Sequence, residues 1–471
     1  MTAGSTPKRR AAAWFSGSVN RRILAAILTV AGFSLVVKAT ATLKELAVAY
    51  RFGTGDAVDA FLIAFLVPSL VVNVLAGSLT SAFTPVYIQV REAQGALAAR
   101  RLFGSAILGC TVLVLAVTFL LLAVTPLGLR LLGAGFSTEK LALTRSLFLL
   151  LLPMVLLSAI ATLWAAALNA EERFATVALA PACVPLVSLV LVLVAGRAWG
   201  IYSLALGTVF GFFVQGGVLA IALARQGLQP FPRWAGMTPE LRSVVAQYAP
   251  MVAGAALTSS SWAIGQAMAT TLPAGSVASL SYGNKVVAMV TEVGSMALAT
   301  AVLPHFSVMV ARRDWTVIRR TIRVYVRLIL AVGVSTTLVL ILASTGIVRL
   351  LFERGAFTES DTSLVARIQA LYMLQVPFVM VGMLFVRLAS SLRKNQILLV
   401  GAAITLPLNV VLNLGLMRWL GVAGIALSTS LVFLASCCYL MIAVHRALGV
   451  AENLHPAAQS AEGVGRSPEA S

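Results

Sequence analysis

The sequence predicts an all-α polytopic membrane protein, with about twelve transmembrane helices in two parallel six-helix lobes around a central cavity. Three observations lead to this prediction: an apolar composition, apolar runs of spanning length, and an internal repeat. Hydrophobic residues make up 59% of the 471 positions and charged residues only 11%. A soluble fold cannot bury that much apolar surface, so the chain is expected to lie in a bilayer.

Runs of about twenty apolar residues are each long enough to cross a bilayer as a helix. They are expected at residues 23–50, 60–90, 102–125, 145–169, 176–196, 201–224, 245–271, 277–303, 322–345, 364–390, 396–417 and 421–444. Two further segments, 127–136 and 347–357, alternate basic and apolar residues, which predicts short amphipathic helices at the outer membrane surface.

The loops between these runs predict the domain organisation. We expect a disordered basic cytoplasmic tail at 1–22, an N-terminal lobe at 23–225, a cytoplasmic linker at 226–244, a C-terminal lobe at 245–446 and a disordered cytoplasmic tail at 447–471. The first tail precedes a run that is too long for a signal-peptide core, so it is expected to be uncleaved. Basic residues favour the loops on the side of this tail, which places both termini in the cytoplasm of a multi-pass plasma (inner) membrane protein.

The net charge of +19 does not indicate nucleic acid as a partner, because the basic residues punctuate apolar runs rather than form one patch. The four cysteines also fall in apolar runs and lack the spacing of metal ligands. They are Cys110, Cys183, Cys437 and Cys438. We expect buried, inert thiols and no metal site.

An internal repeat relates the two halves of the chain. Arg197-Ala-Trp-Gly200 matches Arg418-Trp-Leu-Gly421 at an offset of 221, and Ser81–Pro85 matches Thr300–Pro304 at an offset of 219. Six runs per repeat is an even number, so both halves enter the membrane in the same sense. Two parallel bundles related by an axis along the membrane normal are typical of transporters.

Polar and charged side chains interrupt one apolar run in each half. They are Lys38, Lys44 and Glu45 in the first run, and Asn284, Lys285 and Glu292 in the eighth. Each half has a lysine and a glutamate seven residues apart, which places the pair on nearly one helix face. Charge at membrane depth usually faces a protein interior or a water-filled cavity.

We interpret these residues as the lining of a cationic cavity for an anionic substrate. Two alternatives remain open. The lysine–glutamate pairs at seven-residue spacing could be ion pairs that hold the lobes together, although buried ion pairs add little net stability. Lys44 and Glu45 could instead lie near a helix end, reach water and pair with each other.

Asp56 and Asp59 open the second run. We expect Asp56 to cap the helix and Asp59 to complement the helix dipole, with a direct substrate or ion role for Asp59 as the alternative. The sequence shows no nucleotide-binding loop and no hydrolase motif, so we expect a transporter that is not an enzyme and that needs no cofactor. The drive is then the membrane potential, a gradient of a coupling ion (Na⁺ or H⁺), or removal of product on the far side.

The stretch Arg51–Leu70, followed by Ser81–Val86, resembles the lipid II flippases of the MurJ/MviN family, as do Leu168–Phe174, Ser281–Val286 and Leu351–Thr362. Pro407–Leu431 is similar to the wider multidrug/oligosaccharidyl-lipid/polysaccharide exporter superfamily. This resemblance implies a flippase that translocates a polyprenyl-pyrophosphate-linked glycan precursor from the inner to the outer leaflet by alternating access. It also implies membrane lipids and glycan-synthesis proteins as partners, in peptidoglycan or polysaccharide biosynthesis.

By motif position, three cavity arginines of the family correspond to Lys38, Lys44 and Lys285. The acidic residue beside the second arginine corresponds to Glu45, and the aspartate of the family's DAF triplet corresponds to Asp59. The resemblance thus implies that these residues bind substrate, with a lysine keeping the charge of arginine but not its bidentate geometry.

The chain departs from the family pattern in several places. Val72-Asn73 replaces an arginine pair, Gly77-Ser78 replaces Glu-Gly, and the family usually has two more spans than the twelve expected here. The carried lipid could therefore be lipid II or an exopolysaccharide repeat unit. Two other classes of function stay open: a drug or cation exporter of the same superfamily, and a non-transporting scaffold of a glycan-synthesis complex.

Overall fold

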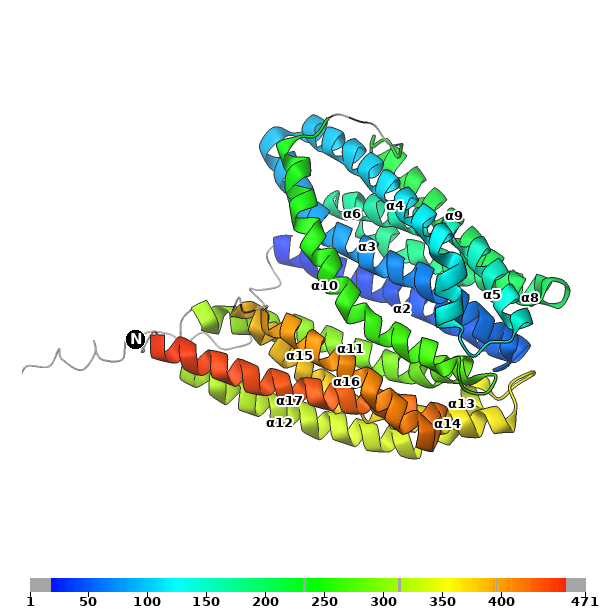
Figure 1. The fold of residues 1–471 in the computed structure, drawn as a ribbon. Helices are drawn as coiled ribbons and strands as arrows, with labels where there is room; N and C mark the ends of the chain where they lie inside the picture. Colours follow the sequence, from blue (N-terminus) through cyan, green and yellow to red (C-terminus); the bar gives the residue numbers. More distant parts are fainter. Residues whose placement is uncertain are drawn as a thin grey trace, which may run out of the picture. The chain divides into compact units, whose positions relative to one another are not determined.

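The structure is a computed structural model that describes residues 18–231, 234, 236–311, 315–392, 394 and 396–454. Helices form all the regular structure in this part of the chain (Figure 1). Their bounds are α2 (Ser18–Phe52), α3 (Asp56–Gln94), α4 (Ala96–Leu132), α5 (Thr138–Leu151), α6 (Pro153–Ala170), α7 (Phe174–Leu179), the 3₁₀ helix η1 (Ala180–Ala182), α8 (Cys183–Trp199), α9 (Tyr202–Arg225), α10 (Pro239–Ala269), α11 (Ser276–Ala311), α12 (Trp315–Leu342), α13 (Ser344–Phe352), α14 (Glu359–Met373), α15 (Val376–Ser391), α16 (Gln396–Leu420) and α17 (Val422–Leu454).

The predicted all-α membrane fold is confirmed. Within the described residues, nine helical spans are long and apolar enough to cross a membrane. Three of them combine successive helices: α5 with α6, α7 and η1 with α8, and α14 with α15. Each of the twelve apolar runs predicted from the sequence falls on a helix or on such a succession of helices.

Two spans are interrupted near their middle by proline. Pro153 is the first residue of α6, directly after the break at Leu152, and Pro377 lies in the first turn of α15, after the break at Leu374 and Gln375. Proline has no N–H for the helix and is tolerated in a first turn, so each of these sequences restarts a helix instead of continuing one.

The predicted repeat is visible in the backbone of two short turns. Gly200 follows α8 with φ +53°, and Gly421 follows α16 with φ +58°. Only glycine adopts this left-handed region without strain, so each glycine ends one helix and lets the next begin within two residues. The two turns lie at the offset of 221 that the sequence repeat predicts, and each joins a pair of helices in contact, α8 with α9 and α16 with α17.

Helices α8 and α9 pack closely through small residues. Gly207 and Gly211 lie one turn apart on α9, and a Cβ atom on either would approach the Cα of Ser188 or Val184 on α8 to 2.6 Å. This is the small-xxx-small pattern that lets transmembrane helices approach each other closely. The pattern holds α8 against α9 by backbone proximity.

We expect Gly207→Val to lower the melting temperature in detergent, because the added side chain must force α9 away from Ser188. Overpacking of this kind costs about 1–3 kcal/mol. Gly217→Val on the same helix is the matched control, since a Cβ atom at Gly217 would meet nothing within 4 Å. Equal melting temperatures for the two variants would show that the close approach is not stabilising.

By their contacts, the residues form two compact units that divide within α10. Unit 1 ends at Ser259 and unit 2 begins at Ser260, while Arg354–Ala356 belongs to unit 1. The sequence predicted the lobe boundary in the linker at 226–244, and α10 begins within that range, at Pro239. The functional assignment of the two lobes stays a prediction.

The helices extend into both predicted tails. Helix α2 begins at Ser18, so residues 18–22 are helical, and α17 continues to Leu454, beyond the expected lobe end at 446. The rest of the predicted tails, 1–17 and 455–471, lies outside the described residues. The two predicted amphipathic segments also differ: 347–357 overlaps the separate short helix α13 at residues 347–352, whereas residues 127–132 are the last turns of α4.

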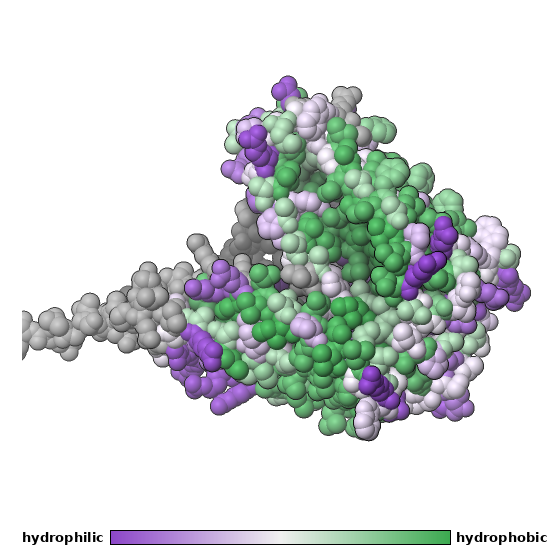
Figure 2. Space-filling model, viewed as in Figure 1, coloured by the Kyte–Doolittle hydropathy of each residue, from purple (hydrophilic) through white to green (hydrophobic). Residues whose placement is uncertain are grey.

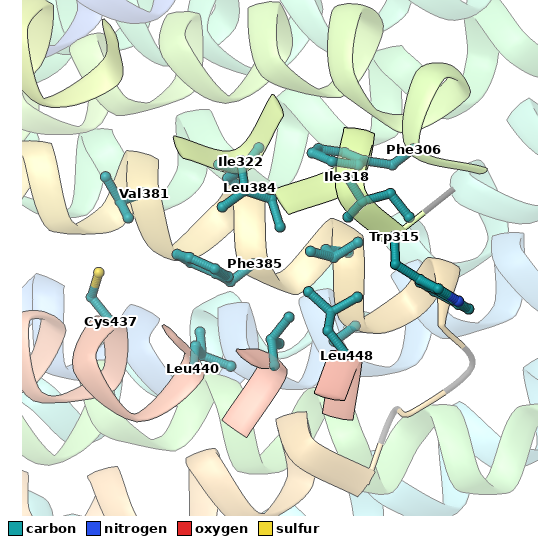
Figure 3. Close-up of a cluster of buried hydrophobic side chains, with 13 residues drawn as sticks. Phe306, Trp315, Ile318, Ile322, Val381, Leu384, Phe385, Cys437, Leu440 and Leu448 are labelled. Carbon is teal, nitrogen blue, oxygen red and sulfur yellow. The ribbon is translucent and has the colours of Figure 1, made fainter. Parts of the chain in front are cut away.

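Unit 2 has a buried apolar cluster that joins four of its helices (Figure 3). Helices α11, α12, α15 and α17 contribute to it. Its buried members are Phe306, Trp315, Ile318, Ile322, Val381, Leu384, Phe385, Leu388, Ala389, Cys437, Leu440, Val444 and Leu448. The thiol of Cys437 is thus part of the packing, and Cys110 is also buried, but Cys438 is exposed, contrary to the expectation of buried thiols.

Large apolar side chains also cover much of the surface that Figure 2 shows. Exposed examples in unit 1 are Phe119 at 68%, Leu193 at 60% and Val194 at 78%. Phe119 lies near the middle of the spanning helix α4, and Leu193 and Val194 lie in α8, the second part of the span Phe174–Trp199. Such surfaces are stable in contact with lipid and not with water.

Candidate functional site

Helix α2 brings Lys44 and Glu45 into direct contact. The Nζ atom of Lys44 lies 2.7 Å from Oε1 of Glu45, with the two side chains 23% and 21% exposed. This is the geometry that the alternative interpretation predicted, with the two neighbours pairing with each other. Lys38, one and a half turns earlier, is exposed on the same helix. Of the two lysines on α2, Lys38 therefore has the more exposed side chain.

Asp59 belongs to a cluster of three charges, which we call the α3–α5 ion cluster (Asp56, Asp59 and Lys140). Lys140 Nζ lies 2.6 Å from Oδ1 of Asp56 and 2.9 Å from Oδ2 of Asp59. The side chains of Lys140 and Asp59 are only 10% and 2% exposed, whereas that of Asp56 is 63% exposed. The buried contact is thus between Lys140 and Asp59.

Local structure explains how α3 and α5 form this cluster. The N-cap of α3 is Gly55, without a side-chain hydrogen bond, so the expectation that Asp56 caps the helix was wrong. Both aspartates lie in the first turn of α3, where the helix dipole favours negative charge. Ser137 caps α5 by accepting a hydrogen bond from the N–H of Lys140 at 3.3 Å, and the lysine ammonium stands 4.1 Å from the centre of the Phe136 ring.

Sequence reasoning missed Lys140. Its partners are 84 and 81 positions away in the sequence, so periodicity could not connect them. Only the packing of α3 against α5 brings the three charges together.

Helix α11 in unit 2 carries Asn284, Lys285 and Glu292. Asn284 and Lys285 are partly buried and Glu292 is exposed. The segment just before them is firmly packed, because the ring of Tyr282 lies 5.2 Å from that of Phe352 and 5.6 Å from that of Phe357. This aromatic cluster fixes the start of α11 and with it the position of Lys285 along the helix.

A second group that sequence reasoning missed lies at the opposite end of α3 from the α3–α5 ion cluster. Arg91 donates to the carbonyl oxygen of Ala170 at 2.8 Å and lies 3.0 Å from Oε2 of Glu171, while Tyr87 donates to the other carboxylate oxygen at 3.2 Å. Glu172, next in the chain, has a φ of +58°. The group ties α3 to the end of α6 and stabilises this turn.

Lysine and glutamate occur together on one helix of each unit, α2 in unit 1 and α11 in unit 2. Helices α2 and α11 together carry three lysines and two glutamates, and one of these glutamates already contacts Lys44. Among the described residues, no group of three or more His, Cys, Asp or Glu could hold a metal ion.

The family model described as lipid II flippase MurJ matches residues 48–462. The chain belongs to the lipid II flippase MurJ family. The matched region includes Asp59, Asn284, Lys285 and Glu292, whereas Lys38, Lys44 and Glu45 precede it. The resemblance to the MurJ family is thus confirmed, and the roles of the individual residues stay predictions.

Curated relatives in the MurJ family are distant in sequence. A probable lipid II flippase MurJ from Rhizobium meliloti (strain 1021) is 27% identical over 411 residues, which cover 84% of this chain and 76% of the relative. The lipid II flippase MurJ of Burkholderia cenocepacia is 26% identical over 362 residues, which cover 74% and 69% of the two chains.

Solved structures show the same fold. The structure titled "Lipid II flippase MurJ, inward closed conformation" matches with a TM-score of 0.77 at 20% identity, covering 91% of this chain and 90% of that one. An inward-facing multidrug resistance transporter of the MATE family matches with a TM-score of 0.76 at 13% identity, covering 89% and 99%. The MurJ fold and the MATE fold are therefore both close to the fold of this chain.

Proposed function

We propose that this MurJ-family chain is a flippase that translocates a polyprenyl-pyrophosphate-linked glycan precursor from the inner to the outer leaflet by alternating access of two lobes. The observation that carries the proposal is the excess of lysines over glutamates on helices α2 and α11. A pyrophosphate is the anionic part of such a substrate, and lysine binds phosphate as a point charge.

Each residue of the proposed site has a role that its surroundings support. Lys38 and Lys285 hold the pyrophosphate, since Lys38 is exposed and Lys285 is partly buried on a firmly packed helix. Glu45 offsets the charge of Lys44, to which it lies 2.7 Å away, and so sets the orientation of this second lysine. Asn284 adds an amide donor beside Lys285, and Glu292 completes the charged face of α11.

Asp59 has a different role in this proposal. Because it contacts Lys140 at 2.9 Å and is only 2% exposed, it acts by holding α3 against α5 and not by touching substrate. The drive for transport is the membrane potential, a Na⁺ or H⁺ gradient, or consumption of the product in the outer leaflet. We further propose an inner-membrane location with both termini in the cytoplasm, near glycan-synthesis proteins.

A leaflet-accessibility assay tests the proposal. The purified chain is reconstituted in proteoliposomes that contain a fluorescent lipid II or a fluorescent lipid-linked exopolysaccharide unit, and an impermeant reagent reads the outer leaflet. We expect time-dependent exchange of one of these lipids above the rate in empty liposomes, and Arg418→Gln, an exposed arginine outside the site, is the control variant. Absence of exchange for every lipid-linked glycan, with correctly folded protein, would rule the proposed function out.

A further inference from the structure

A cavity of about 330 Å³ lies between the last turns of α4 and the first three turns of α5, in unit 1. Arg130 on α4 and Arg145 on α5 both line it, together with the hydroxyl-bearing side chains of Thr138 and Ser146. The rest of its lining is largely apolar and includes Leu129, Leu141 and Leu149. The volume falls at the lower end of the range of about 300–1,000 Å³ that is usual for sites of small ligands.

The charge of this cavity is suited to an anion. None of its ten lining residues, all in the described part of the chain, is acidic. Within the same part of the chain, neither Arg130 nor Arg145 forms a salt bridge, although the nearby Lys140 contacts two aspartates. Two guanidinium groups without carboxylate partners are suited to a phosphate, which arginine binds through paired N–H donors.

The length of α4 places the cavity at the membrane surface. Arg101 and Arg130 are the charged residues that flank its apolar stretch, and they are 29 positions apart on one helix. At 1.5 Å per residue this distance is about 44 Å, close to the thickness of about 40–45 Å of a bilayer with its headgroups. Arg130 therefore lies at the level of the lipid headgroups when Arg101 lies at the opposite surface.

The surroundings of the cavity are apolar on the membrane side. Leu127 and Leu131, on the same turns of α4, are 64% and 69% exposed, and Leu149 at the α5 side is 43% exposed. The hydroxyl groups of Ser146 and Tyr202 form a hydrogen bond at 2.7 Å, which holds the Ser146 side chain in place at the cavity wall. An occupant thus meets cations and hydroxyls at one end and exposed leucines at the other.

We propose that this cavity binds the headgroup of an anionic phospholipid of the phosphatidylglycerol type. The phosphodiester lies between Arg130 and Arg145, the glycerol hydroxyls face Thr138 and Ser146, and the acyl chains run along the exposed leucines of α4. The site is separate from the lysines of α2 and α11, and it does not depend on the proposed transport function.

Native mass spectrometry of the full chain with phosphatidylglycerol and, separately, phosphatidylethanolamine of the same acyl chains tests the proposal. Wild-type protein should retain phosphatidylglycerol preferentially. Arg130→Gln/Arg145→Gln should weaken that binding by about tenfold or more, because it removes two charge-assisted hydrogen-bonding groups. Arg367→Gln/Arg418→Gln, which removes the same net charge from exposed positions outside the cavity, should leave binding unchanged.

A second variant keeps the test independent of charge and of the stability of the double variant. Ala142 lines the cavity and is exposed, so Ala142→Trp should fill the cavity without disturbing the core and should remove the phosphatidylglycerol preference. Unchanged phosphatidylglycerol binding in both variants would overturn the proposal. So would equal retention of the two phospholipids by wild type, or retention of a polyprenyl phosphate without phosphatidylglycerol.

Discussion

Replacing Lys38 or Lys285 with glutamine should abolish flipping in proteoliposomes, while expression and the melting temperature in detergent stay near those of wild type. The proposal places each lysine against the pyrophosphate. Removing one partner of a desolvated ionic contact typically costs about 2–5 kcal/mol, which is a large loss for a transport cycle. Lys38→Arg and Lys285→Arg should keep substantial activity, because the cationic charge is retained.

The charge-swapped variants Lys38→Glu/Glu45→Lys and Lys285→Glu/Glu292→Lys distinguish this role from a purely structural one. If each lysine only formed an ion pair with its glutamate, the single glutamine variants would be unstable, and the swaps would regain both stability and transport. Stable, inactive single variants that the swaps fail to rescue would support substrate binding.

Lys140→Met should lower the free energy of unfolding of the protein by about 3–5 kcal/mol, because the carboxylate of Asp59 would lose the cation 2.9 Å away while remaining buried. Asp56→Asn is the matched control. Its carboxylate contacts the same ammonium at 2.6 Å but is 63% exposed, and an exposed pair contributes about 1 kcal/mol or less. Thermal unfolding, followed in a single detergent, measures the loss of stability in Lys140→Met and in Asp56→Asn.

The double variant Lys140→Met/Asp59→Leu completes this experiment. Replacing both partners of a buried ion pair with apolar residues is often neutral, so the double variant should recover most of the stability that Lys140→Met loses. A double variant that is as unstable as the sum of its single substitutions would mean that the α3–α5 ion cluster does not hold α3 against α5.

The fold could be predicted because its main determinants are local or periodic. Apolar length decides where each spanning helix lies, and Gly200 and Gly421 end helices through their own backbone conformation, so the repeat is readable in the sequence. The breaks at Pro153 and Pro377 are also local, although the sequence reading assigned one uninterrupted run to each span.

The candidate site could be predicted only in part. Lysines and glutamates inside apolar runs are visible without a structure, and so is the contact of Lys44 with Glu45, because the two are neighbours. The contact of Asp59 with Lys140 is set by the packing of α3 on α5, and the group of Arg91 with Glu171 by the packing of α3 on α6. No pattern in one sequence reports which distant helices meet, so these contacts stayed hidden.

The glycine turns at Gly200 and Gly421 also bear on the order in which the chain folds. Each joins two adjacent helices by a connection of two residues or less, so α8–α9 and α16–α17 are contacts of low sequence separation. Closing such short loops costs little entropy, and local contacts of this kind form fast. These two hairpins can therefore assemble as soon as both of their helices have been synthesised and inserted, ahead of sequence-distant contacts such as that of α2 with α8.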